Sequence, residues 1–111
     1  MTIAIDFSKI IGFDWDQGNN RKNVDKHGVN QSEAEQVFFN QVLLLAEDPG
    51  HSRTEQRFHA LGTTNTGRRL HVTFTLRGDA TLIRVISARD MHRKEKFYYE
   101  REIPIASHLR H

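Results

Sequence analysis

Two arginines interrupt or follow a strongly apolar stretch, where a positive charge is costly unless an anion pairs with it. Arg84 lies inside the apolar run of residues 82–86, and Arg89 stands just after it, where a helix is expected to begin. Each guanidinium needs a carboxylate, such as that of Glu55, or a phosphate group of a ligand. Because arginine holds two phosphate oxygens at once and stays charged, the pattern favours a phosphate-bearing partner. Arg57, on an earlier expected strand, is a third candidate.

Groups that could move a proton occur in the same part of the chain. His59 and His71 titrate near neutral pH and lie on neighbouring expected strands. Tyr99 could take part only if neighbouring arginines lowered its pKa. The plainer interpretation is that the histidines are exposed strand residues and that an aromatic at helical spacing belongs to the core. Together with the arginines, these side chains could remove or donate a proton and stabilise negative charge at a phosphodiester.

The charges divide unevenly along the chain. Residues 1–50 hold four Lys or Arg against eight Asp or Glu, a net charge of −4, whereas residues 51–111 hold twelve against six, a net charge of +6. This asymmetry favours a nucleic acid as the partner, although a charged surface that only keeps the protein soluble fits it equally well. The basic residues expected to hold such a ligand are Lys26, His27, Arg69, His71 and Arg93.

Two of these assignments have a simpler alternative. His27 stands beside Gly28 at an expected helix end, where it could bond the terminal carbonyl groups instead of a ligand. Glu55 could act as a base, but orienting Arg57 or Arg89 is the more economical role.

Several other chemistries are not supported. The chain has no cysteine, and His51, His59 and His71 lack the spacing of a metal-binding pair. There is no glycine-rich phosphate loop and no serine or threonine in a nucleophile elbow. We therefore expect no metal and no cofactor. No apolar window reaches the length of a membrane span, and the N-terminus lacks a cleavage site for export, so we expect a cytoplasmic protein that does not bind membranes.

Capping residues predict three helices. The first follows Asp16 and runs to residue 26 or 27, where Gly28 suits the left-handed conformation that ends a helix. The second opens at Asn30, and Glu33 completes a capping box. The third opens at Asp90 and ends near residue 103, because a proline follows it.

A period of two predicts the strands between the second and third helices. After a first strand near residues 10–15, we expect strands at 42–46, 56–62, 68–77 and 80–88. The Gly78-Asp79 pair suits a two-residue hairpin. The predicted fold is an α+β single domain over residues 1–111, with an antiparallel sheet of about four to five strands and all helices packed on one face. Residues 103–111 could form a flexible tail.

Alternation also assigns the two faces of this sheet. The apolar face should hold Phe58, Ala60, Leu70, Val72, Phe74, Leu76, Ile83 and Val85. The opposite face should hold Arg57, His59, Arg69, His71, Thr73, Thr75 and Arg84. One face is therefore core, and the other is cationic and rich in imidazole.

Several short segments, spread in order over about residues 12–100, form a recognisable pattern. They are Phe13–Asp16, Asn23, Lys26–Val29, Glu33–Ala34, Val37–Phe38, Glu55, Arg57–Phe58, Leu61–Gly62, Gly67–Leu70, Arg84–Arg89 and Glu95–Tyr99. Their order and spacing resemble the BrnT family of ribonuclease toxins from type II toxin–antitoxin systems, relatives of the RelE/ParE superfamily.

The resemblance implies a RelE-like fold and a metal-independent endoribonuclease that inhibits translation by cutting RNA. The substrate's own 2′-hydroxyl would attack the phosphate. In this interpretation the catalytic residues are Arg57, Arg84, Arg89, His59 and Tyr99, the RNA-binding residues are Lys26, His27, Arg69, His71 and Arg93, and Glu55 orients an arginine.

The resemblance also implies a protein partner. Toxins of this kind are neutralised by a cognate antitoxin, here a BrnA-like DNA-binding protein of the ribbon-helix-helix type, and the pair represses its own operon. Operator DNA would then be contacted indirectly, through the antitoxin. Two alternatives stay open: a module that binds nucleic acid without cutting it, and a co-repressor that has lost its activity.

Overall fold

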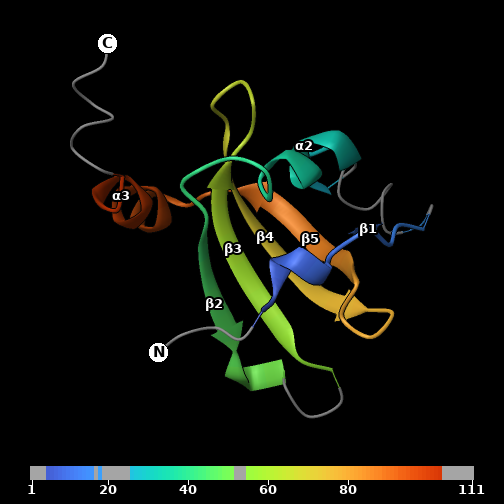
Figure 1. Cartoon of the computed structure of the whole chain (residues 1–111). Coiled ribbons are helices and arrows are strands. Elements are labelled where there is room, and N and C mark those ends of the chain that lie inside the picture. Colours follow the sequence, from blue (N-terminus) through green and yellow to red (C-terminus); the bar gives the residue numbers. More distant parts are fainter. Residues whose placement is uncertain (1–4, 17, 19–25, 52–54, 104–111) are drawn as a thin grey trace.

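The alternating apolar and polar residues after position 42 form four strands, and a short strand near the N-terminus completes a sheet of five (Figure 1). The computed structural model describes residues 5–16, 18, 26–51 and 55–103. In chain order the elements are η1 (Phe7–Lys9), β1 (Gly12–Phe13), α2 (Gln31–Gln36), β2 (Leu44–Asp48), η2 (Pro49–His51), β3 (Arg57–Thr63), β4 (Arg69–Arg77), β5 (Leu82–Asp90) and α3 (Arg93–Arg101). No helix among the described residues is both long enough and apolar enough to cross a membrane.

The strand order in the sheet is β1-β5-β4-β3-β2. The four strands from β2 to β5 form the expected antiparallel meander. The prediction of a wholly antiparallel sheet was wrong for β1, which runs parallel to β5 and pairs Gly12 with Leu82 and Phe13 with Ile83. The sheet is therefore mixed. Sequence patterning predicted the strand but not its partner, because β1 and β5 lie far apart in the sequence.

The turn between β4 and β5 also differs from the prediction. Gly78, Asp79 and Ala80 all have positive φ angles, of 59°, 56° and 66°. The strands pair from Arg77 and Leu82 outward, so four residues make the turn instead of two. This longer turn moves the start of β5 from the expected residue 80 to Leu82.

The apolar face was predicted correctly. Among its members, Ala60, Leu70, Val72, Phe74 and Val85 are completely buried. Val29, Ala34 and Val37, from α2 and the residues beside it, join the same core cluster. Gly62 allows the segment around Val37 to pack closely on the sheet, because a Cβ at position 62 would lie 2.6 Å from Cγ1 of Val37.

The helix caps were predicted in part. Asn30 and Glu33 form the expected capping box, and Gly28 has the expected positive φ of 65°. Asp90 is not the N-cap of α3; it ends β5 and accepts hydrogen bonds from Arg68. The N-cap is residue 92. The sequence offered Asp90 as the better capping side chain, but the strand continues to this residue because it pairs with Leu70.

Two helix predictions fall wholly or mostly outside the described residues. Of the first expected helix, only Gly18, Lys26 and His27 are described, and all three are helical. The possible tail at 103–111 is described only at Ile103.

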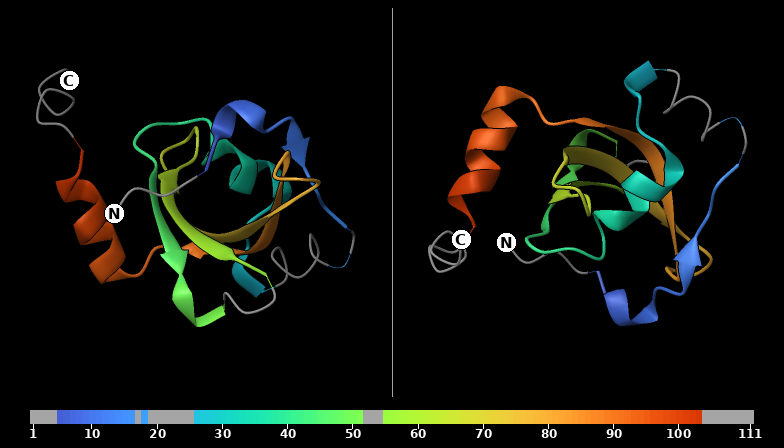
Figure 2. Two further views of the ribbon diagram at one scale, coloured as in Figure 1. Left: turned by 60° about the horizontal axis from the view of Figure 1, so that its bottom comes forward. Right: turned by 90° about the horizontal axis from the view of Figure 1, so that it is seen from above.

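The prediction that all helices cover one face of the sheet was wrong. The core side of the curved sheet faces α2, whereas α3 lies on the other side, beside β2 and β3 (Figure 2). Tyr99 of α3 lies under the guanidinium of Arg69, and Glu95 of α3 lies beside His71. Arg69 and His71 belong to the polar face, so α3 closes over the cationic side.

A β-bulge in β5 decides which arginines share that face. The register shifts between Thr73, which pairs with Ser87, and Phe74, which pairs with Val85, so Ile86 is an extra residue. In a regular strand Arg84 and Arg89 would point to opposite faces, because they are an odd number of residues apart. The bulge places both on the polar face.

Candidate active site

The polar face is built from cross-strand rows of residues. One row contains Leu44, Leu61, His71 and Arg89, and the next contains Ala46, His59, Thr73 and Ser87. Beyond them Asp48 pairs with Arg57, and Thr75 pairs with Arg84. The register therefore brings both histidines and Arg89 together, with Arg57 two residues along β3 from His59.

The two histidines are directly hydrogen-bonded. Nδ1 of His59 lies 2.9 Å from Nε2 of His71, and it also lies 3.1 Å from the hydroxyl of Thr73. On its other side, Nε2 of His59 lies 3.1 Å from a carboxylate oxygen of Asp48. The side chain of His59 is 31% exposed and that of His71 is 13% exposed. Asp48 therefore anchors a pair of imidazoles that ends at the more buried ring.

Glu95 of α3 joins this pair to Arg89. Nη1 and Nη2 of Arg89 donate to the two carboxylate oxygens of Glu95 at 2.8 and 2.9 Å. The backbone N–H of His92 also donates to Glu95, which fixes the carboxylate at the start of the helix. Nδ1 of His71 lies 3.7 Å from Glu95, too far for a direct hydrogen bond but near enough for one group to bridge them.

The protonation states of this cluster follow from its contacts. Burial, together with the positive charge of Arg89, lowers the pKa of His71 to about 4, so its ring is neutral at physiological pH. The hydrogen bonds from Arg89 lower the pKa of Glu95 to about 2, so its carboxylate is charged. The site thus combines a neutral imidazole with a fixed ion pair.

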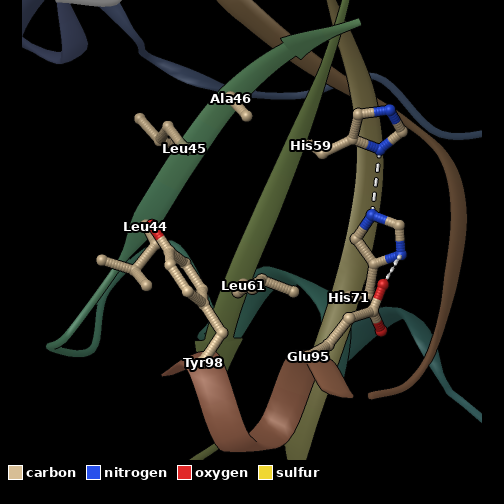
Figure 3. A pocket seen from close by; sticks show the side chains of 8 residues that line it. All are labelled: Leu44, Leu45, Ala46, His59, Leu61, His71, Glu95 and Tyr98. Carbon is tan, nitrogen blue, oxygen red and sulfur yellow. Dashed lines mark hydrogen bonds and ion pairs between the residues drawn. The ribbon is translucent and has the colours of Figure 1, made fainter. Parts of the chain in front are cut away.

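A pocket of about 370 Å³ opens beside these groups, between α3 and strands β2 to β4. Figure 3 shows the histidines and Glu95 on one side of it, and the apolar side chains with Tyr98 on the other. The residues that line it are Leu44, Leu45, Ala46, His59, Leu61, His71, Glu95 and Tyr98. Ionisable groups and an apolar surface therefore meet in one cavity.

Comparison with known proteins assigns the chain to a protein family. The family model for the ribonuclease toxin BrnT of type II toxin–antitoxin systems matches residues 15–95. The chain belongs to the BrnT family. The crystal structure of the Brucella abortus ribonuclease toxin BrnT is similar at 22% identity with a TM-score of 0.54, over 75% of this chain and 99% of that chain. That likeness supports the BrnT fold. A search of curated proteins found no match.

Arg84 and Arg57, two of the predicted catalytic residues, lie outside this pocket. Arg84 donates to Asp16 at 2.5 Å and lies 3.6 Å from Asp14, and the bond to Asp16 raises the pKa of Arg84. It therefore holds the segment after β1 against the sheet. Arg57 has no carboxylate partner among the described residues and remains near His59.

Tyr99 and Arg69 form a packing unit. Tyr99 is fully buried, its hydroxyl donates to the carbonyl of Val42 at 2.5 Å, and burial raises its pKa. The condition for a catalytic role, a lowered pKa, is therefore not met. The guanidinium of Arg69 lies 5.1 Å from the centre of the Tyr99 ring and 3.7 Å from Glu100.

The remaining candidates are dispersed. Lys26 and Arg93 are exposed, and the carbonyl of His27 accepts from Arg68 at 3.4 Å. Glu55 pairs with Arg77 at 2.8 Å, so the expectation that it orients Arg57 or Arg89 is replaced by a different partner.

Sequence reasoning did not single out three residues of the site: Asp48, which contacts His59, and Glu95 and Tyr98, which line the pocket. A signal for Glu95 existed: it stands three residues after the true N-cap, where a capping carboxylate is common. Asp48 and Tyr98 became visible only through the strand register and the side on which α3 packs.

Proposed function

We propose that this chain is the toxin of a type II toxin–antitoxin system and a metal-independent endoribonuclease that inhibits translation by cutting RNA. Family membership supports a ribonuclease. The observation that supports a site is a pocket lined by the hydrogen-bonded pair His59 and His71 and by Glu95, whose carboxylate forms an ion pair with Arg89. This combines a neutral base with a cation that can hold a phosphate.

His71 is the proposed general base. In the arrangement that we propose, Nε2 of His59 donates to Asp48, and Nδ1 of His59 accepts the Nε2 proton of His71. This leaves a lone pair on Nδ1 of His71, the nitrogen near Glu95. A ribose 2′-hydroxyl placed there gives up its proton to Nδ1, and the imidazolium that forms is stabilised by the Glu95 carboxylate. The 2′-oxygen attacks the phosphorus, and the leaving 5′-oxygen takes a proton from solvent.

Arg89 is the proposed group that holds the scissile phosphate. A guanidinium has five N–H donors, and three of them reach Glu95 and the carbonyl of Asp90. Two donors are left without a partner among the described residues. They are available to bind phosphate oxygens as negative charge builds up.

The test is cleavage of a defined RNA by the purified protein in the presence of EDTA. We expect fragments that end in a 2′,3′-cyclic phosphate and begin with a 5′-hydroxyl. His71→Gln should reduce the rate by about 10²- to 10⁴-fold, as expected for loss of a general base. Intact RNA after prolonged incubation with folded wild-type protein contradicts the proposal. Cleavage that EDTA abolishes contradicts the metal-free route.

Type II membership also supports a proposed antitoxin partner. We expect a BrnA-like ribbon-helix-helix protein that neutralises the toxin and with it represses the operon. Co-expression of the protein encoded beside the toxin should abolish RNA cleavage. A gel shift on the upstream DNA should occur with the antitoxin, tighten when the toxin is added, and be absent with the toxin alone.

The charge pairing disfavours a module that only binds nucleic acid. Arg69, Arg84 and Arg89 are each paired with a carboxylate, so the polar face offers a weaker electrostatic attraction than its sequence suggested. A face that attracts phosphates only by net charge would leave such cations unpaired.

A further inference from the structure

The proposed chemistry leaves half of the pocket unexplained. Proton transfer uses the side with the histidines and Glu95, and phosphate binding uses Arg89, which is paired with Glu95, while the other side of the pocket is apolar. Its lining residues are Leu44, Leu45, Ala46, Leu61 and Tyr98. Leu44 and Leu61 are directly paired across β2 and β3, so they form a continuous apolar floor beside the catalytic groups.

Tyr98 is the aromatic side chain at this floor. It is 53% exposed, whereas its neighbour Tyr99 is fully buried against Arg69. Among the described residues the other large hydrophobic side chains with comparable exposure are Ile11, Phe39 and Phe97. Those three do not line this pocket, which leaves Tyr98 as the exposed aromatic ring across the pocket from the histidines (Figure 3).

The occupant of this half must suit both sides of the cavity. A group that packs on Leu44 and Leu61 and against the exposed ring of Tyr98 must be flat, with apolar faces. It must also be attached to a phosphate that reaches Arg89, the ion-pair partner of Glu95 on the opposite side. A nucleobase, joined through its ribose to the phosphodiester, has both properties, and bases stack on aromatic side chains in many single-stranded complexes.

We infer that the apolar half of the pocket binds one unpaired nucleobase of the RNA, next to the scissile phosphate, and that Tyr98 stacks on it. This inference rests on the proposed ribonuclease function and names a determinant of its substrate. The polar groups that line the pocket bond to one another and not to a base edge, so the bases differ mainly in the area that they stack on Tyr98. Purines have the larger ring system and are therefore favoured.

The experiment compares three variants on a short single-stranded RNA with a purine beside the cleavage site. Tyr98→Ala should raise KM by about 10- to 100-fold, the range for loss of one stacking contact, with a smaller change in kcat. Tyr98→Phe keeps the ring and should stay within about threefold of wild type. Phe97→Ala, which removes an exposed ring of the same helix outside the pocket, should not change KM.

A second measurement uses the wild-type protein and so does not depend on the folding of a variant. An otherwise identical RNA with an abasic nucleotide at that position should show the same rise in KM. Tyr98→Ala should then lose no further affinity on the abasic RNA, because both changes remove one contact.

The outcomes separate this inference from the proposed function. Wild-type protein that cleaves RNA but is unaffected by both Tyr98→Ala and the abasic nucleotide overturns the base pocket and leaves the ribonuclease intact. Loss of activity in Tyr98→Phe also overturns it, since the hydroxyl and not the ring would then be required. Wild-type protein that cleaves no RNA overturns the proposed function itself.

Discussion

Arg84 and Arg89 lie on the same strand, on the same face and at nearly equal exposure, 23% and 24% of their side chains, yet their surroundings differ. Arg84 contacts Asp14 and Asp16, which follow β1 at one edge of the sheet. Arg89 contacts Glu95 of α3, beside the histidines and the pocket. We call these the β1 end and the α3 end of the polar face.

The comparison shows that a charge in an apolar strand does not by itself mark a reactive group. At the β1 end the guanidinium fastens one segment of chain to the sheet, which is a structural task. At the α3 end the ion pair shares its carboxylate with a helix cap and lies close to an imidazole. The difference lies in the partners, which the strand sequence does not contain.

Exchanging each arginine for alanine tests this comparison most strongly. Arg89→Ala should reduce the rate of RNA cleavage by about 10²- to 10³-fold, because it removes the cation that stabilises the transition state. Arg84→Ala should leave the rate within about threefold and lower the free energy of unfolding by about 1 kcal/mol, since its ion pair is partly exposed. Cleavage rates and urea unfolding curves of both variants provide the measurement.

The opposite result would assign the active site to the β1 end of the polar face. If Arg84→Ala abolished cleavage in a folded protein while Arg89→Ala kept it, the reactive arginine would lie at the β1 end. Circular dichroism of both variants is the control for loss of fold.

Asp48→Asn should have a smaller effect within the α3 end. An amide can donate to Nε2 of His59 and so reverse the direction of the hydrogen bonds through the histidine pair. We expect a 10- to 100-fold lower kcat with little change in KM, about the size seen for residues that orient other ligating or reactive groups. An unchanged kcat would mean that the anchoring of His59 does not matter for the reaction.

The sequence predicted the core better than the site. Strand alternation identified Phe58, Leu70 and Val85 as buried because burial repeats every second residue and needs no knowledge of partners. It also predicted that His59 and His71 share a face, since they lie on adjacent paired strands.

The arrangement of the site depended on features with a weak sequence signal. The bulge at Ile86 reversed the side on which Arg89 points, and nothing in the apolar run of residues 82–86 marks its position. The packing of α3 on the polar side brought Glu95 and Tyr98 to the histidines. The bulge and the packing side of α3 both depend on tertiary contacts, because long-range pairing selects between local conformations of similar energy.

The pH dependence of stability should give the smallest difference between the two ends. In the folded protein burial lowers the pKa of His71 to about 4, whereas in the unfolded chain it returns to its ordinary value near 6.5. Between pH 4 and 6.5 the unfolded state therefore binds more protons, so the free energy of unfolding rises with pH across this window and levels off above it.

His71→Gln removes the titrating group and should flatten this part of the curve, by roughly 1 to 3 kcal/mol between pH 4.5 and 7. Glu95 does not affect this comparison. Its pKa is lowered to about 2, so the stabilisation that its charged form gives the folded protein is lost below pH 4.5. Arg84→Ala changes the β1 end, where the partners are carboxylates, and should keep the wild-type slope. Urea unfolding at several pH values measures all three proteins. Equal slopes for wild type and His71→Gln would show that His71 is not held neutral by burial.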